Sequence, residues 1–126
     1  MLYQNILLID DDEDDQEIFL SALENASNTV KCVVLDNAVQ AFDKLRKSEL
    51  DTDIIFLDLN MPLMNGQEFL AQIKKQQDLK DIPVIILSTS SNQAAIQQAK
   101  KLGAVDFITK PHSFDDLVQI LRRVLV

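Results

Sequence analysis

Five short apolar runs divide the chain at intervals of about 20 to 30 residues. Three of the runs contain only Ile, Leu, Val and Phe, with no polar residue to mark a solvent-facing side. Runs of this length and composition are typical of strands that are buried on both faces, as in a parallel sheet. The five expected strands lie at 6–9, 30–35, 54–57, 84–87 and 104–109.

The segments between and after these runs have apolar residues at helical spacing, so strands and helices alternate along the chain. This alternation predicts an α/β fold, a doubly wound five-stranded parallel sheet flanked by five helices. We adopt strand order 2-1-3-4-5, the flavodoxin-like order that is common for small sheets of this kind. The expected helices cover 13–25, 38–47, 66–76, 91–102 and 113–125.

The length and composition indicate one soluble domain over residues 1–126. The chain has 126 residues, of which 47% are hydrophobic and 25% are charged. No apolar run approaches the about 18 residues of a membrane span, and the N-terminus lacks the basic region of a signal peptide. The single cysteine, Cys32, cannot form an internal disulfide. We therefore expect a cytoplasmic protein without membrane association.

The formal net charge is −8. An acidic protein is disfavoured as a direct nucleic-acid partner, because phosphate backbones bind Lys and Arg. The charge suits a protein that binds metal ions or basic surfaces, and it also serves simple solubility.

Polar residues follow four of the five expected strands directly. Asp10 and Asp11 follow the first strand, Asp58 follows the third, Ser88 the fourth and Lys110 the fifth. The carboxyl ends of parallel strands meet at one edge of the sheet, and ligands bind there where the strand order reverses. In the expected order this reversal lies between the first and third strands, so the three aspartates should converge.

Three converging carboxylates with a single lysine nearby repel one another unless a cation joins them. Mg²⁺ prefers oxygen ligands and binds one or two carboxylates together with water and phosphate oxygens. We therefore predict Mg²⁺, with Mn²⁺ as a possible substitute, and a phosphoryl ligand. The alternative is that the acids are loop and helix-start residues, and this interpretation is favoured for Asp12, Glu13 and Asp14, since acids stabilise a helix's first turn.

The run of six acids from Asp10 to Asp15 also invites comparison with a calcium-binding loop. With Asp10 at position 1, position 6 is Asp15, where that loop needs Gly. Position 12 is Ser21, where the loop needs a bidentate Glu. The comparison therefore fails.

The chain resembles the CheY-like receiver domain of two-component response regulators over essentially its whole length. The resemblance rests on "ILLIDDDEDD", "IIFLDLNMPLMNG", "PVIILSTSS" and "GAVDFITKP", which occur in the family's order and spacing. It implies that Asp58 is the phosphoacceptor. It also implies a Mg²⁺ site of Asp11, Asp58 and the backbone carbonyl of Asn60, with Asp10 acting mainly through water.

The resemblance implies further roles around the phosphoacceptor. The Ser88 hydroxyl would bond a phosphoryl oxygen, and Lys110 would pair with the phosphorylated Asp58. Phe107 stands at a switch position that is often Tyr, although packing in the core is a real alternative for it. The bond between Lys110 and Pro111 is expected to be cis, a form that X–Pro bonds tolerate.

The implied function is that of a signalling domain rather than an enzyme. A sensor histidine kinase or a histidine phosphotransfer protein would donate the phosphoryl group. The sequence ends after the fifth expected helix without an output domain. A protein target would therefore bind the face formed by the helix at 91–102, the strand at 104–109 and the helix at 113–125, or the phosphoryl group would pass onward to another protein. One alternative is a pseudo-receiver scaffold that is never phosphorylated. The other is a Mg²⁺-dependent aspartate phosphatase, which would need an acid where Asn60 stands.

Overall fold

The computed structural model describes residues 3–59, 61, 63–89 and 92–125. Five strands alternate with five helices through this part of the chain. The strands are β1 (Asn5–Ile9), β2 (Lys31–Leu35), β3 (Ile54–Leu57), β4 (Val84–Ser88) and β5 (Asp106–Thr109). The helices are α1 (Glu13–Ala26), α2 (Ala38–Arg46), α3 (Gly66–Lys74), α4 (Gln93–Lys101) and α5 (Phe114–Leu125).

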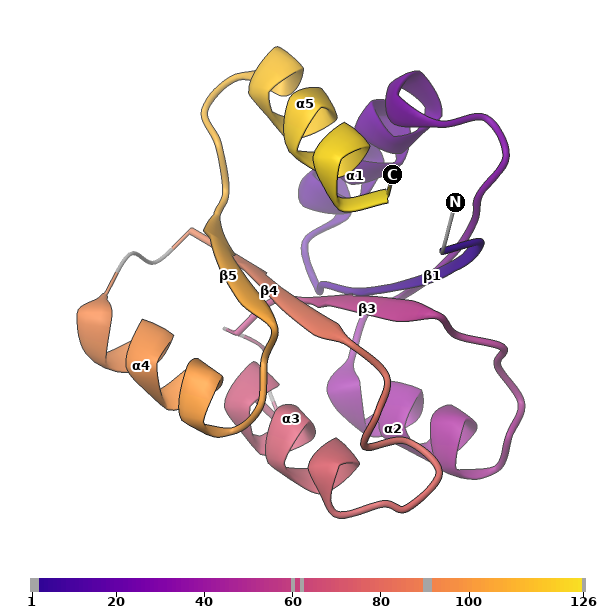
Figure 1. Cartoon of the computed structure of the whole chain (residues 1–126), viewed down its shortest axis with the longest axis vertical. Helices are drawn as coiled ribbons and strands as arrows, with labels where there is room; N and C mark the ends of the chain where they lie inside the picture. The colour runs from indigo at the N-terminus through magenta and orange to yellow at the C-terminus, as the bar shows by residue number, and fades with distance from the viewer. Residues whose placement is uncertain (1–2, 60, 62, 90–91, 126) are drawn as a thin grey trace.

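The strands form one sheet in the order β2-β1-β3-β4-β5, and every neighbouring pair is parallel. Helices α1 and α5 cover one face of the sheet, and α2, α3 and α4 cover the other (Figure 1). The predicted fold class and strand order are therefore confirmed. Among the helices of the described residues, none is both long enough and apolar enough to cross a membrane.

The central strand β1 supplies side chains to both halves of the core. Ile6 and Leu8 pack in the cluster beneath α1 and α5, whereas Leu7 and Ile9 pack in the cluster beneath α2, α3 and α4. Successive side chains of a strand point to opposite faces, so an uninterrupted apolar run fills both layers. This explains why the first run contains no polar residue.

The start of α1 uses the acids that follow β1. Asp12 is the N-cap residue, and its side chain accepts a hydrogen bond of 3.0 Å from the backbone N–H of Asp15. Glu13, Asp14 and Asp15 occupy the first turn, where unpaired N–H groups and the helix dipole stabilise negative charge. The expectation that Asp12, Glu13 and Asp14 open a helix is confirmed.

Candidate functional site

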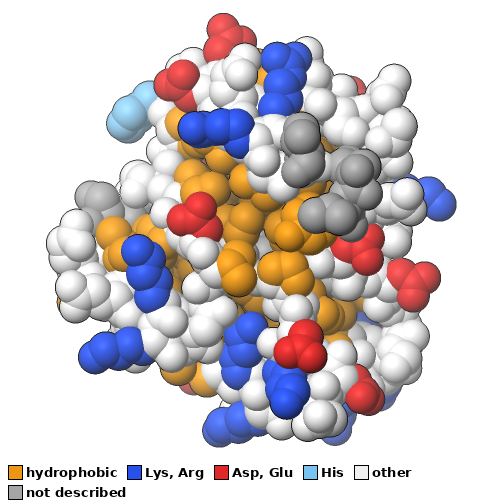
Figure 2. Space-filling model, in the orientation of Figure 1, with side chains coloured by type: hydrophobic (Ala, Val, Ile, Leu, Met, Phe, Trp, Pro, Cys, Tyr) orange, Lys and Arg blue, Asp and Glu red, His pale blue; other side chains and the backbone are white. Residues whose placement is uncertain are grey.

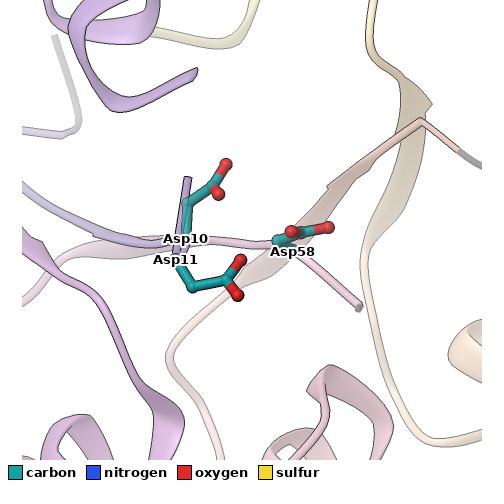
Figure 3. A group of neighbouring side chains, drawn as sticks. All are labelled: Asp10, Asp11 and Asp58. Atoms are coloured by element: carbon teal, nitrogen blue, oxygen red, sulfur yellow. The ribbon is translucent and has the colours of Figure 1, made fainter. Parts of the chain in front are cut away.

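Three aspartates meet at the carboxyl ends of β1 and β3. These strands are neighbours, with Ile9 opposite Leu57, and the backbone N–H of Asp58 donates to the Ile9 carbonyl at 3.0 Å. Asp10 and Asp11 follow β1 directly, so they lie beside Asp58 (Figure 3). One carboxylate oxygen of each aspartate lies within 4.8 Å of the other two. The convergence predicted from the strand order is present in the structure.

The three aspartates differ in their exposure to solvent. Asp10 and Asp58 are buried, with 2% and 8% of their surface exposed, whereas Asp11 is exposed. Repulsion between carboxylates is strongest where water is excluded, so Asp10 and Asp58 need a compensating positive charge. A divalent cation that enters from the side of Asp11 would supply it, and the all-oxygen donor set matches the preference of Mg²⁺ or Mn²⁺.

The carboxylate of Asp10 is held by two protein donors. One oxygen, Oδ1, accepts from the backbone N–H of Asp12 at 3.0 Å, and Oδ2 accepts from Lys110 Nζ at 2.9 Å. Figure 3 shows the side chains of Asp10 and Asp11 leaving the end of β1 in different directions. Asp10 is thus turned toward the lysine, an arrangement that suits an indirect contact with a metal ion.

Lys110 brings a positive charge to the site. Its Nζ lies 2.7 Å from Asp15 Oδ2 as well as 2.9 Å from Asp10 Oδ2, and its side chain is only 14% exposed. Burial alone would lower the pKa of Lys110, but the hydrogen bonds to Asp15 and Asp10 and the nearby charges of Asp58 and Asp10 outweigh it. The pKa of Lys110 is therefore raised, and the ammonium form is secured at neutral pH.

Ser88 and Lys110 are tied together through the backbone. Ser88 ends β4 and is fully buried, and its carbonyl accepts a hydrogen bond of 2.7 Å from the backbone N–H of Lys110. Both residues therefore lie at the same edge of the sheet as the aspartates, as the sequence predicts. Phe107, in β5, is half-buried and packs against the core cluster beneath α2, α3 and α4. Its predicted switch role remains a prediction beside this packing role.

The peptide bond before Pro111 differs from the prediction. The bond between Lys110 and Pro111 is trans, since the described residues contain no cis peptide bond, and the prediction of a cis bond is wrong. The trans form is the more stable one for X–Pro bonds, and here it coexists with the Lys110 contacts to Asp10 and Asp15. The predicted metal contact of Asn60 lies outside the described residues.

The contact between Asp15 and Lys110 was missed by the sequence analysis. Asp15 belongs to an acidic first turn, which the sequence explains by helix capping alone. Its partner is 95 positions away, and no periodicity or local pattern connects two such residues. The sequence contains two hints only. A basic residue follows the last strand, and an acid stands about one helical turn after Asp10 and Asp11.

Comparison with known proteins agrees with this geometry. Residues 6–122 match the family model described as the response regulator receiver domain. The chain belongs to this family. One relative is response regulator Rcp1 of Synechocystis, which is 30% identical over 124 residues that cover 94% of this chain and 84% of Rcp1.

Two solved structures of receiver proteins share the fold. The phosphorylated cyanobacterial phytochrome response regulator RcpA has a TM-score of 0.88 and 33% identity, over 97% of this chain and 91% of RcpA. The Mn²⁺-bound form of response regulator Rcp1 has a TM-score of 0.85 and 28% identity, over 96% of this chain and 91% of that chain. The likeness extends over nearly the whole receiver domain.

Proposed function

We propose that this receiver domain accepts a phosphoryl group from a phosphohistidine onto Asp58. The observation that carries the proposal is the convergence of the Asp10, Asp11 and Asp58 carboxylates, within 4.8 Å, beside the ammonium group of Lys110. The donor would be a sensor histidine kinase or a histidine phosphotransfer protein, as the family membership suggests. The domain then acts as a signalling switch or relay rather than as an enzyme with a separate substrate.

Mg²⁺ would be held by the side chains of Asp11 and Asp58 and by the backbone carbonyl of Asn60, with Asp10 acting through water. The all-carboxylate cluster and its excess of negative charge support a hard divalent cation. The Mn²⁺-bound structure of Rcp1 supports a divalent ion in a similar fold. When bound, the ion neutralises charge on the phosphoryl oxygens.

The chemical step uses Asp58 as the nucleophile. A carboxylate oxygen of Asp58 attacks phosphorus, the phosphorus–nitrogen bond of the phosphohistidine breaks, and its electron pair remains on the imidazole nitrogen. The Lys110 ammonium and the Ser88 hydroxyl supply donors for the oxygens of the transferred group. The hydrogen bond from the Lys110 N–H to the Ser88 carbonyl holds both residues at the same edge of the sheet. Positioning and charge stabilisation are most of what phosphoryl transfer requires.

The signal would leave through α4, β5 and α5. Among the described residues of α4, Ala99 is the one buried side chain, whereas α3 buries Phe69, Leu70 and Ile73. A helix with so little buried apolar surface is held weakly by the core and can shift at low cost. Movement of Lys110 and Ser88 toward the new phosphoryl group would displace the equilibrium of this helix and of Phe107.

A groove beside β5 suits the binding of a protein target. Figure 2 shows hydrophobic side chains gathered across the middle of the face over the strands, with charged groups around them. The groove has a volume of about 680 Å³, and Val105 beside it is 61% exposed. An exposed apolar surface with a polar rim is typical of a protein interface. Residues along the groove include Tyr3, Val105, Phe107, Ile120 and Arg123.

The proposal is tested by labelling the protein with acetyl phosphate in the presence of Mg²⁺. The mass of the intact wild-type protein should increase by one phosphoryl group, and chelation of the metal should prevent this. Asp58→Asn should remain unlabelled, whereas Asp78→Asn, which changes an exposed acid elsewhere, should be labelled like the wild type. Equal labelling of Asp58→Asn would refute the assignment.

Two further measurements separate the remaining alternatives. A protein that neither becomes labelled nor binds beryllofluoride with Mg²⁺ would act as a pseudo-receiver scaffold. Continuous turnover of a generic phosphate ester would indicate an aspartate phosphatase.

A further inference from the structure

Asp15 forms a shorter ion pair with Lys110 than Asp10 does, although Asp15 is outside the aspartate cluster. Its Oδ2 lies 2.7 Å from Lys110 Nζ, compared with 2.9 Å for Asp10 Oδ2. Asp15 belongs to the first turn of α1, and Lys110 follows β5, so the contact joins two elements from opposite ends of the chain. Helix capping alone does not explain this contact, because the other acids of the same turn serve the helix while exposed to solvent.

The position of Asp15 is fixed by hydrogen bonds at the start of α1. Its backbone N–H donates to the Asp12 side chain at 3.0 Å, which sets the first turn of the helix. The Gln16 side chain donates to the Asp10 carbonyl at 2.6 Å, which ties the helix to the end of β1. The carboxylate of Asp15 is therefore presented to Lys110 by a rigid helix start rather than by a loop.

The surroundings strengthen the pair. Asp10, Asp15 and Lys110 line a small cavity of about 80 Å³ whose other walls are mainly apolar. The side chain of Asp15 is 34% exposed and that of Lys110 is 14% exposed, so water screens the pair only in part. The apolar part of the wall is formed by Leu8, Ile18, Phe19, Leu87, Pro111 and Leu117.

We propose that Asp15 is a positioning residue that holds the Lys110 ammonium on the α1 side of the site and opposes its movement to a phosphoryl group on Asp58. The inference rests on the proposed function, since it concerns the lysine that would bind that group. An ammonium group has three donors, and two of them are engaged by Asp10 and Asp15. A ligand at Asp58 can use the third donor, but drawing the ammonium toward it lengthens the pair with Asp15, so this pair biases the domain toward its resting state.

The test compares Asp15→Asn with Asp14→Asn. Asp14 is an exposed acid in the same helical turn, so the two variants lose the same charge from the start of α1. Asparagine keeps the size of the side chain and removes its charge. Affinity for beryllofluoride, a mimic of the phosphoryl group, is measured with saturating Mg²⁺ for each protein. Asp15→Asn should bind it about three- to fivefold more tightly than Asp14→Asn does.

A second measurement uses the metal-free protein without the mimic. The ¹⁵Nζ and ¹H resonances of the Lys110 ammonium report on its hydrogen bonds. If Asp15 only stabilised the start of helix α1, its substitution would leave these resonances unchanged. They should shift or broaden in Asp15→Asn and stay at their wild-type positions in Asp14→Asn.

Equal beryllofluoride affinities in the two variants, or unchanged Lys110 resonances in Asp15→Asn, would overturn the role of Asp15. If the wild-type protein binds no beryllofluoride with Mg²⁺, the proposed function itself fails, and this result is distinct from equal binding by both variants.

Discussion

Gly66 lies directly against the backbone of Asp58. A Cβ atom at position 66 would stand 2.5 Å from the Asp58 carbonyl oxygen and 2.8 Å from the Cα of Leu59. The backbone N–H of Gly66 also donates to the Leu59 carbonyl at 3.0 Å. The first turn of α3 is thus pressed against the segment that carries the proposed phosphoacceptor, and only a residue without a side chain permits this approach.

Gly66→Ala is therefore expected to destabilise the protein and to disturb the site. Overpacking against the rigid backbone should lower the free energy of unfolding by roughly 2 kcal/mol. It should also reduce the labelling of Asp58, because the backbone of that residue must move. Denaturant unfolding and acetyl phosphate labelling measure the two effects. Gln67→Ala, one position further along α3, is the control, and similar losses in both variants would show that the close approach has no special role.

Asp11 and Asp14 allow a test of the metal site against diffuse negative charge. Both acids are exposed and lie close together in the sequence, but only Asp11 belongs to the cluster with Asp10 and Asp58. Asp11→Ala should weaken Mg²⁺ binding by at least about tenfold, since loss of even an indirect contact has such an effect. Asp14→Ala should leave the affinity nearly unchanged. Titration calorimetry measures the Mg²⁺ affinity of each variant. Equal losses of affinity in Asp11→Ala and Asp14→Ala would mean that the acids attract the ion only through their summed charge.

Asp53 stabilises the amino-terminal ends of the central strands, at the end of the sheet opposite to the site. Its carboxylate accepts hydrogen bonds from the backbone N–H groups of Gln4 at 2.9 Å and Asn5 at 2.8 Å. These bonds lower the pKa of Asp53, because they favour the charged form. A carboxyl group whose pKa is lowered in the folded state contributes stability above its unfolded pKa of about 3.9, and this contribution is lost as the pH falls through the folded value.

Asp53→Asn should therefore lower the free energy of unfolding at pH 7 by about 1 kcal/mol or less, because the group is partly exposed to water. The difference from the wild type should shrink as the pH falls below about 4. Asp51→Asn removes an exposed acid two positions earlier and should show neither effect. Urea unfolding at a series of pH values measures the difference, and a difference that stays constant with pH would contradict the assignment.

The sequence predicted the bounds of β1 to β4 to within one residue at each end and those of β5 less well. The apolar run at 54–57 coincides with β3, and the run at 84–87 misses only Ser88 of β4. Strand β5 begins at Asp106 rather than at position 104, because the Ala104 N–H still bonds back to the Ala99 carbonyl of α4 and Val105 lies in a bend, although its N–H already donates to the Val84 carbonyl. Apolar residues in a connection and in a strand look alike in sequence. Burial on both faces removes this ambiguity for the central strands, whereas β5 is only partly buried and follows an apolar connection.

The site was predictable where it depends on topology and not where it depends on side-chain contacts. The convergence of Asp10, Asp11 and Asp58 follows from the strand order and from their places after β1 and β3. The choice of Asp15 as a partner for Lys110 depends on how far α1 lies from the end of β5, which no local pattern encodes. The trans bond before Pro111 was missed for a related reason, since the family's usual isomer does not decide the isomer of one chain.

Leu63 combines an unfavourable backbone conformation with exposure to water. It has a φ of 70°, and 85% of its surface is exposed. A branched residue in the left-handed region is strained, whereas Asn tolerates this region. Leu63→Asn should raise the free energy of unfolding by roughly 0.5 to 1 kcal/mol. Leu63→Ala removes the exposed side chain but keeps the strain, so it should give no such gain. Equal stabilisation by both substitutions would attribute the effect to the lost apolar surface.

Cys32 has an environment that suppresses its reactivity. Burial raises the pKa of the Cys32 thiol to about 12, although a hydrogen bond with the backbone of Leu8 opposes the shift. The thiolate is the nucleophile, so iodoacetamide should modify the native protein very slowly at pH 8 and the unfolded protein readily. Intact-protein mass measures the modification over time. Fast alkylation of the native protein would show that the thiol is accessible and ionised.

The shift at Cys32 also predicts how stability depends on pH in the alkaline range. In the unfolded chain the thiol ionises at about pH 8.5, whereas in the native protein it stays protonated until about 12. Between these values the native state binds more protons, so the free energy of unfolding should fall as the pH rises. In Cys32→Ala, the free energy of unfolding should fall less steeply between about pH 8.5 and 10, because the contribution of the thiol is removed and the other groups titrate as before. Parallel stability curves for the wild type and Cys32→Ala in this range would contradict the shift.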